Sequence, residues 1–390
     1  MLITIIVFVL VLSVIVFVHE MGHFYTARKL GVKVDEFGLG LPPRIFGVKK
    51  IAGKFKLVWG KQAIEKDSPT IYSLNWIPVG GFVKIKGESG EEAGAVDSFA
   101  SKGVGKRSVM IVAGVVMNVI LCMVLLSIGF GFGMPAALDD NLSKQATVSN
   151  QTIQVIQLMP DSQAKLAGIQ VGDVISKVNG QEFKTISELN TFLSARNGQE
   201  LSFAIIRRGE KIDKNIKIGS YSYEGREIVG IGIGLIETAI VRYPWYLAIY
   251  KGVIATFVWM GAIIIAFATV IKNLVLGVPT GVEVAGPVGI AVLTGQAAKM
   301  GIIYLLQFTA LLSLNLAIIN ILPFPALDGG RLLFLILEKI RGRAVKQEWE
   351  NLVHNLGFII LMGLVLLVTF GDVIKYGGGL FGTIKHLFGF

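Results

Sequence analysis

The stretch VFVHEMGHFY, Val16 to Tyr25, places two histidines and a glutamate at the end of an apolar run that begins at the first residue. Ionisable side chains inside a membrane span are costly and are therefore usually functional. Residues four apart lie on one face of a helix, so His19 and His23 can offer ring nitrogens to a single ion. With Glu20 beside them, the stretch predicts a membrane-spanning helix that carries a metal site.

The pattern His19, Glu20 and His23 is the H-E-x-x-H arrangement of metalloproteases, in which the glutamate is a general base rather than a ligand. Neutral imidazole is a good zinc ligand, and three protein ligands leave a position for a water whose pKa the ion lowers. Glu20 could accept the proton of that water and return it to the leaving amine. The alternative is that these residues cap the span at the interface, satisfied by headgroups and water.

Composition favours an integral membrane protein. Of the 390 residues, 53% are hydrophobic and only 16% are charged, well below the norm of soluble domains. The net charge of +10 comes from basic residues clustered in loops beside apolar runs, which is typical of membrane orientation and argues against a nucleic-acid partner. The single cysteine, Cys122, excludes a disulfide framework and a cysteine-rich zinc site. Residues 1–18 lack a basic start and a small-residue cleavage site, so we expect a retained span.

The zinc site needs a third ligand. His354 and His386 both look like interface residues, whereas Asp328 in NILPFPALDGG is a lone carboxylate at the end of a charge-free run. Pro323 and Pro325 cannot continue a regular helix, and unpaired backbone at membrane depth is tolerated only where protein or a water-filled cavity supplies partners. Asp328 is therefore the better candidate, although PALDGG could also be an ordinary exit turn at the membrane surface.

Five charge-free apolar runs reach spanning length, namely residues 1–18, 109–133, 252–271, 302–327 and 355–371. If 252–271 crossed the membrane, Asp328 would lie on the face opposite the histidines, separated by about the 30 Å hydrocarbon core. One ion could not then bind all three. We therefore expect four spans, with 252–271 lying on or dipping into the outer leaflet.

Residues 152–219 have the character of a small soluble module, with short β-type runs, a turn at Asn179 and Gly180, and one short helix. The stretch AKLAGIQVGDVISKVNG resembles a PDZ domain, a family that binds extended peptides by adding a strand to a sheet edge. The alternative is a small β-rich domain with no peptide ligand.

Three stretches together resemble the site-2 protease family of intramembrane zinc metalloproteases, a peptidase family M50 type, and most closely its bacterial regulator-of-sigma-E type. They are VHEMGHF in the first span, the PDZ-like module, and NILPFPALDGGR near the C-terminus. The resemblance covers most of the chain. It implies one zinc ion per chain with ligands His19, His23 and Asp328, Glu20 as catalytic base, and Asn320 in contact with the substrate backbone.

Other stretches match the family less sharply. IPVGGFVKIKGE resembles its membrane-dipping β-hairpin, which holds substrate as an added strand and implies substrate contacts at Gly80, Gly81, Phe82 and Val83. AGVVMNV resembles its Gly-x-x-x-Asn motif, although Val115 stands where the family often has proline. The family's best-known member has two PDZ modules and this chain has one. The positions expected to be structural are Gly114, Asn118, Pro323, Pro325 and Gly329.

We therefore expect a polytopic α-helical membrane protein with four transmembrane helices, a membrane-associated β-hairpin or sheet region and one inserted PDZ-like α+β domain. Along the chain these are a first transmembrane helix (1–27), a cytoplasmic-side loop with the β-hairpin (28–107), a second transmembrane helix (108–135), the PDZ-like domain (150–220), a membrane-surface helical segment (245–300), a third transmembrane helix with the LDG motif (301–330), a cytoplasmic amphipathic helix (331–353) and a fourth transmembrane helix (354–373).

The function implied is intramembrane proteolysis in a bacterial cytoplasmic (inner) membrane. The substrates would be single-span proteins of the anti-sigma-factor or signal-peptide-remnant class, already shortened by another protease. The active site would lie near the cytoplasmic side, and the extracytoplasmic PDZ-like domain would filter substrates or bind a peptide. Two alternatives stay open: a divalent-metal transporter that uses the same residues, and a catalytically silent membrane scaffold.

Overall fold

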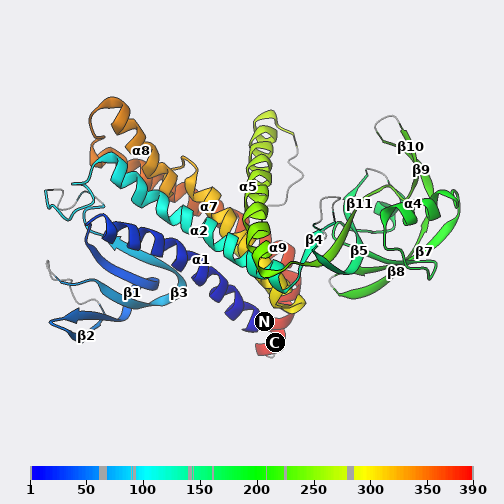
Figure 1. Ribbon diagram of the computed structural model, residues 1–390, viewed down its shortest axis with the longest axis horizontal. Helices are drawn as coiled ribbons and strands as arrows, with labels where there is room; N and C mark the ends of the chain where they lie inside the picture. Colours follow the sequence, from blue (N-terminus) through cyan, green and yellow to red (C-terminus); the bar gives the residue numbers. More distant parts are fainter. Residues whose placement is uncertain are drawn as a thin grey trace. The chain divides into compact units, whose positions relative to one another are not determined.

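The computed structural model describes residues 2–60, 68–88, 90, 94–138, 143, 145–159, 162–207, 209–223, 226–278 and 285–388. The chain forms two compact units (Figure 1). The first, here called the membrane unit, comprises residues 1–126, 252–301 and 305–390, and the second comprises residues 127–251 and 302–304.

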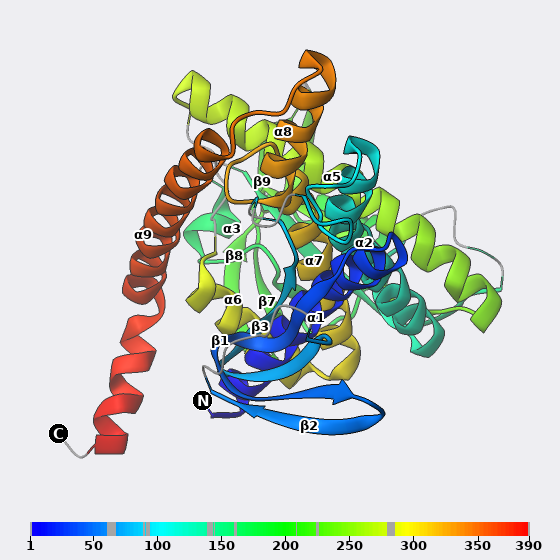
Figure 2. The same cartoon turned by 90° about the vertical axis from the view of Figure 1, so that its left-hand side faces the viewer.

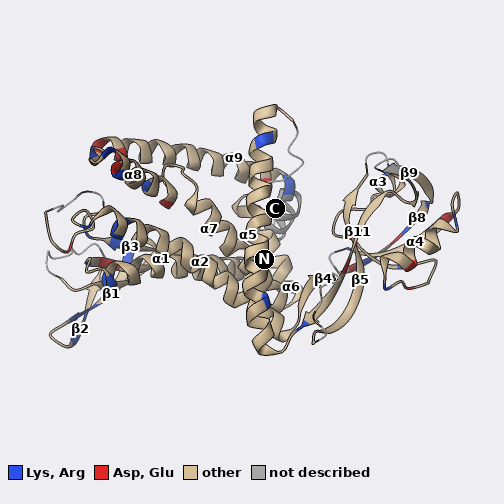
Figure 3. Ribbon diagram, turned by 45° about the horizontal axis from the view of Figure 1, so that its top comes forward, with Lys and Arg blue, Asp and Glu red and all other residues tan. Residues whose placement is uncertain are grey.

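Among the described residues, five helices are long and apolar enough to cross a membrane. They are α1 (Leu2–Lys29), α2 (Val104–Phe132), α5 (Trp245–Leu276), α7 (Ile302–Ile321) and the Gln347–Lys375 part of α9 (Gln347–Phe388). Figure 3 shows α1, α2 and α7 without charged residues along most of their length. The chain is a multi-pass membrane protein of the expected class. Four crossings were expected, and length and composition do not decide whether α5 is a fifth.

Helices α1 and α2 lie side by side (Figures 1 and 3), and a glycine of α1 faces the backbone of α2. A Cβ added at Gly22 of α1 would overlap the carbonyl group of Ala113 on α2. Small residues allow helix backbones to approach in this way inside a membrane. The close approach brings the backbone of α2 up to the histidine face of α1.

The expected β-hairpin region is a three-stranded sheet of order β2-β1-β3, made of β1 (Val34–Ile51), β2 (Lys54–Trp59) and β3 (Ile71–Ile85). Figure 2 shows it beside α1. Strand β3 bends so that its two halves, at Ser73 and Phe82, both pair with Gly38 of β1, which places the end of β3 at an edge of the sheet. A buried ion pair with an Arg44 Nη2 to Glu36 Oε2 distance of 2.5 Å ties the two halves of β1 together.

Two shorter helices complete the membrane unit. Helix α6 (Pro287–Met300) contacts α1 and α9, and α8 (Asp328–Arg341) follows the proline-interrupted segment after α7. Basic residues in the last turn of α8, Lys339 and Arg341, complement the negative C-terminal end of the helix dipole.

The second unit contains the PDZ-like domain. Its six-stranded sheet has the order β4-β11-β5-β6-β7-β8. The strands are β4 (Met134–Ala137), β5 (Thr147–Leu158), β6 (Val174–Val178), β7 (Glu200–Arg207), β8 (Glu210–Lys217) and β11 (Ile233–Arg242), with β9 (Gly219–Tyr223) and β10 (Arg226–Gly230) as a separate hairpin and α3 (Gln163–Leu166) and α4 (Ile186–Ser194) as helices. The turn expected at Asn179 and Gly180 is present, with φ of 49° and 78°. Strands β4 and β11 extend this sheet beyond the expected limits of 150–220.

Candidate metal centre and catalytic cavity

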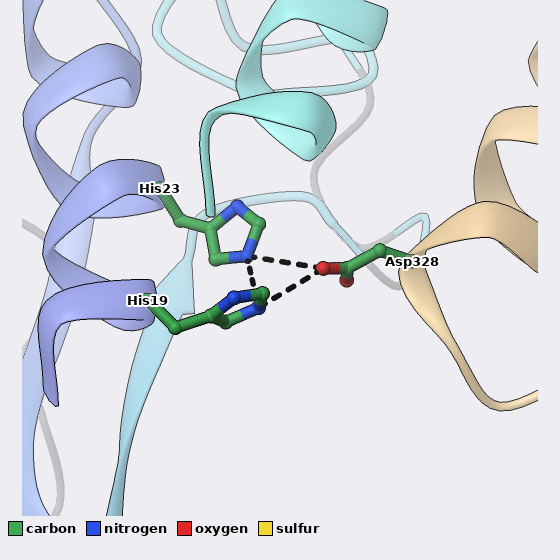
Figure 4. Close-up of side chains that lie close together, drawn as sticks. All are labelled: His19, His23 and Asp328. Carbon is green, nitrogen blue, oxygen red and sulfur yellow. Dashed lines mark hydrogen bonds and ion pairs between the residues drawn. The ribbon is translucent and has the colours of Figure 1, made fainter. Parts of the chain in front are cut away.

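His19 and His23 of α1 meet Asp328, which lies 309 residues after His19, at one point of the membrane unit (Figure 4). His19 Nε2 lies 3.0 Å from Asp328 Oδ2, and His23 Nε2 lies 3.4 Å from the same oxygen. The two Nε2 atoms are 3.1 Å apart. Both histidines are buried, with exposed fractions of 5% and 8%. This burial argues against the alternative in which lipid headgroups and water hydrogen-bond to them at the interface.

Each histidine is held at its other ring nitrogen. His23 Nδ1 donates to the carbonyl oxygen of Met110 on α2 at 2.8 Å, which leaves a lone pair on Nε2 of the neutral ring. His19 Nδ1 lies 3.3 Å from the side-chain amide of Asn118, also on α2. When the Asn118 amide is turned so that its oxygen accepts from Nδ1–H of His19, Nε2 of that ring also carries a lone pair. Such outer partners orient metal ligands and fix their tautomers.

Gly114 of α2 lies so close to the two histidine rings that no larger residue fits there. A Cβ built there would overlap the His23 and His19 rings. Gly114 and Asn118 are four residues apart, so both project from α2 toward the histidines. The expected Gly-x-x-x-Asn motif thus lies at the site. Gly114 leaves room for the histidine rings, and Asn118 contacts the ring of His19.

The break between α7 and α8 brings Asp328 to the histidines. Leu322 leaves the helix in an extended conformation, and Pro323 and Pro325 occupy the irregular segment that follows. Asp328 is the first residue of α8. A Cβ at Gly329 would overlap the carbonyl groups of Ile321 and Leu322, so α8 can start this close to the end of α7 only with glycine there.

The donor set fits a zinc ion. Two imidazoles and a carboxylate are zinc ligands of the catalytic type, and all three offered atoms lie within 4.8 Å of one another. Tetrahedral ligands about 2.0–2.1 Å from zinc lie roughly 3.3 Å apart. The separations of 3.0, 3.1 and 3.4 Å agree with that value.

A cavity of about 430 Å³ opens beside this centre. Its lining includes His19, Glu20 and His23 of α1, Phe82 and Val83 of β3, and Asp328 of α8. Gly80 brings β3 close to α1, since a Cβ there would lie only 3.3 Å from Val16 Cγ1, whereas a Cβ at Gly81 would make an ordinary contact with Glu20 Cγ at 3.7 Å. Asn320 also reaches the centre, with Nδ2 3.4 Å from His19 Nε2.

Sequence reasoning missed three titratable residues that line the cavity. Arg331 and Glu88 form an ion pair that joins α8 to the turn after β3. His354 on α9, expected at the interface, instead receives a hydrogen bond from the backbone of Ala326. The spacing of three residues between Asp328 and Arg331 on an amphipathic helix could have indicated Arg331, whereas nothing local pointed to His354. For His386 the structure describes the helix but not the side chain.

Comparison with known proteins agrees with this chemistry. The family model of peptidase family M50 matches residues 7–364. The zinc metalloprotease RasP of Geobacillus kaustophilus is 29% identical over 96% of this chain and 98% of its own length. The regulator of sigma-W protease RasP of Bacillus subtilis is 28% identical over 95% and 98%. Among solved structures, the PDZ domain of an SdrC-like protein from Listeria monocytogenes covers 23% of this chain and 92% of its own, at 22% identity and a TM-score of 0.21.

Proposed function

This chain belongs to peptidase family M50 and is a membrane zinc metalloprotease, and we propose that it cuts peptide bonds within the transmembrane segments of single-span proteins. The observation that carries the proposal is the meeting of His19, His23 and Asp328 beside Glu20 in a cavity of the membrane unit. Placing these groups on a membrane helix is costly, and the cost is hard to explain for a protease of soluble peptides.

In this proposal His19, His23 and Asp328 hold one zinc ion. When bound, the ion acts as a Lewis acid and acidifies a water. Glu20 lies on α1 beside His19 and lines the cavity, so its carboxylate can take a proton from the attacking water and pass it to the leaving amine. Asn118 and the Met110 carbonyl keep the two rings aimed at the centre throughout.

One edge of strand β3 could bind an unwound substrate as an added strand. A transmembrane helix must be locally unwound before its amide bonds can be attacked, and the freed backbone groups then need partners. Residues 81–85 pair with β1 along one edge, and within the described part of the sheet no strand pairs with their other edge. Phe82 and Val83 line the cavity, so we infer that substrate adds as a strand here, with the Asn320 amide as a further backbone contact.

The proposed setting is a bacterial cytoplasmic membrane, with the metal centre near the cytoplasmic face and the PDZ-like domain outside. There the domain would admit substrates already shortened by another protease, or bind a peptide of its own. One relative is named regulator of sigma-W protease, which agrees with substrates of the anti-sigma-factor class.

The proposal is tested by cleavage of a model single-span substrate in proteoliposomes, with the cut site located by mass spectrometry. Wild type should cut inside the apolar segment. Glu20→Gln should retain zinc and lose cleavage, while Glu182→Gln, a surface carboxylate of the PDZ-like domain, should cleave as wild type. Cleavage outside the membrane segment, or full activity of Glu20→Gln, would contradict the proposal. Divalent-metal transport that survives Glu20→Gln would favour the transporter instead.

A further inference from the structure

The segment that delivers Asp328 contains one residue in an unusual conformation. Ala326, two positions before Asp328, has φ of 76°. The left-handed region is unfavourable for a residue with a Cβ and persists only where surrounding structure holds it. Something must therefore fix the backbone at Ala326, and the position of Asp328 depends on it.

Helix α9 supplies that support at two points. The Ala326 N–H donates to His354 Nδ1 at 2.9 Å. One turn later, a Cβ added at Gly357 would overlap the Cβ and carbonyl of Pro325, so the α9 backbone lies directly on this segment. The first contact is a specific hydrogen bond and the second is steric.

The chemistry of the ring shows which of its atoms matters. Because Nδ1 accepts a hydrogen bond, the neutral ring carries its proton on Nε2. That Nε2 is buried and has no hydrogen-bond partner among the described residues, and the ring packs on Phe334 with centroids 5.6 Å apart. An apolar side chain would fill this space without an unpaired N–H. What a hydrocarbon could not supply is the acceptor for Ala326.

We propose that His354 is a positioning residue for the metal centre: its Nδ1 holds Ala326 in the left-handed conformation and thereby keeps the Asp328 carboxylate within reach of His19 and His23. The inference rests on the proposed role of Asp328 as a zinc ligand. Partners that orient metal ligands typically change metal affinity by about 10–100-fold when removed.

The test measures zinc affinity of the purified full-length protein by competition with a chelator, together with the thermal midpoint of the zinc-free protein. Two amide variants separate the ring nitrogens. His354→Asn places an acceptor oxygen near the position of Nδ1, whereas His354→Gln places its amide near Nε2. We expect His354→Asn to bind zinc within about threefold of wild type, and His354→Gln and His354→Ala to bind about 10–100-fold more weakly.

A second variant isolates the backbone. Glycine adopts positive φ freely, so Ala326→Gly should lessen the need for the hydrogen bond. Added to His354→Ala, it should restore much of the zinc affinity, while alone it should change affinity little. A merely structural role for His354 predicts lowered thermal midpoints with no recovery of zinc affinity.

The outcomes separate this inference from the proposed function. If Asp328→Ala binds zinc as wild type, the ligand assignment itself is wrong. If Asp328→Ala loses zinc but His354→Asn and His354→Gln bind it equally, the inference is overturned. The same comparison decides the matter if His354→Ala does not fold.

Discussion

The two histidine rings meet Asp328 because each is held at its other nitrogen, His23 by the Met110 carbonyl and His19 by the Asn118 amide. The spacing of the histidines was readable from the sequence, since helix periodicity is a local property. The Met110 contact was not, because any residue can offer a main-chain oxygen. The structure brings the predicted residues together, and their zinc ligation stays a prediction.

Gly114 leaves the space that the two histidine rings occupy, so its substitution should disturb the metal site. Gly114→Ala would push a methyl group into both histidine rings, so we expect loss of zinc from the purified protein with the helices retained by circular dichroism. Gly105→Ala on the same helix is the matched control, since its Cβ would meet nothing within 4 Å. Full zinc content in Gly114→Ala would show that α2 does not press on the rings.

A side chain of α9 caps the N-terminus of α6, a contact that was not expected. Helix α6 has no side-chain cap of its own at Gly286, but Asp372 of α9 accepts the Gly289 N–H through Oδ2 at 2.6 Å and is only 5% exposed. No local pattern indicates this pairing, since 83 residues separate the two groups. A carboxylate at a helix N-terminus satisfies an unpaired N–H and complements the helix dipole.

Removing this cap should destabilise the fold. We expect Asp372→Ala to cost about 1–2 kcal/mol of stability, within the range of lost helix caps, and to lower the thermal midpoint in detergent. Asp372→Asn keeps an acceptor oxygen and should lose less. Ile374→Ala, at a position 69% exposed, serves as the control. Equal midpoints for Asp372→Ala and the control would contradict the capping role.

In the PDZ-like domain, Arg207 at the end of β7 binds Asp173 just before β6, with Nε 2.7 Å from Oδ1. Burial would raise the pKa of Asp173, but the hydrogen bonds from Arg207 and from the Gln170 N–H outweigh it and hold the pKa below its usual value. A carboxyl with a depressed folded pKa stabilises the fold above its unfolded pKa of about 3.9, and that contribution is lost as the pH falls through the folded value.

The stability difference between wild type and Asp173→Asn should therefore be constant from pH 7 to about 5 and shrink below about pH 4. Thermal unfolding of the full-length protein, followed by the strand signal in circular dichroism, measures it. A difference that does not change between pH 5 and 3 would show that this carboxyl has the same pKa folded and unfolded.

For the whole molecule, topology follows from where the site residues meet. His19 and His23 lie in the C-terminal half of α1, and Asp328 follows the C-terminal end of α7, so we infer that these two ends face the same side of the membrane. Crossings by both α2 and α5 would require a further return between residues 276 and 302, where the described helix, α6, has 14 residues. Composition identifies the apolar helices, and the shared metal site indicates which of them cross the membrane and in which direction.

We therefore predict that α5 does not cross completely. In a Cys122→Ala background, Val278→Cys just after α5 should react with a membrane-impermeant maleimide from the same side as Ser187→Cys in the PDZ-like domain. Lys54→Cys in the β1–β2 hairpin should react from the other side. Labelling of Val278→Cys together with Lys54→Cys would mean that α5 spans the membrane.

We propose that two histidines of α1 and Asp328 of α8 hold one zinc ion in the membrane unit. The zinc-edge X-ray absorption spectrum of the purified wild-type protein tests it most directly. We expect about one zinc per chain with two imidazole neighbours and otherwise oxygen ligands near 2.0–2.1 Å. A third imidazole, a sulfur neighbour near 2.3 Å or no bound zinc would contradict it.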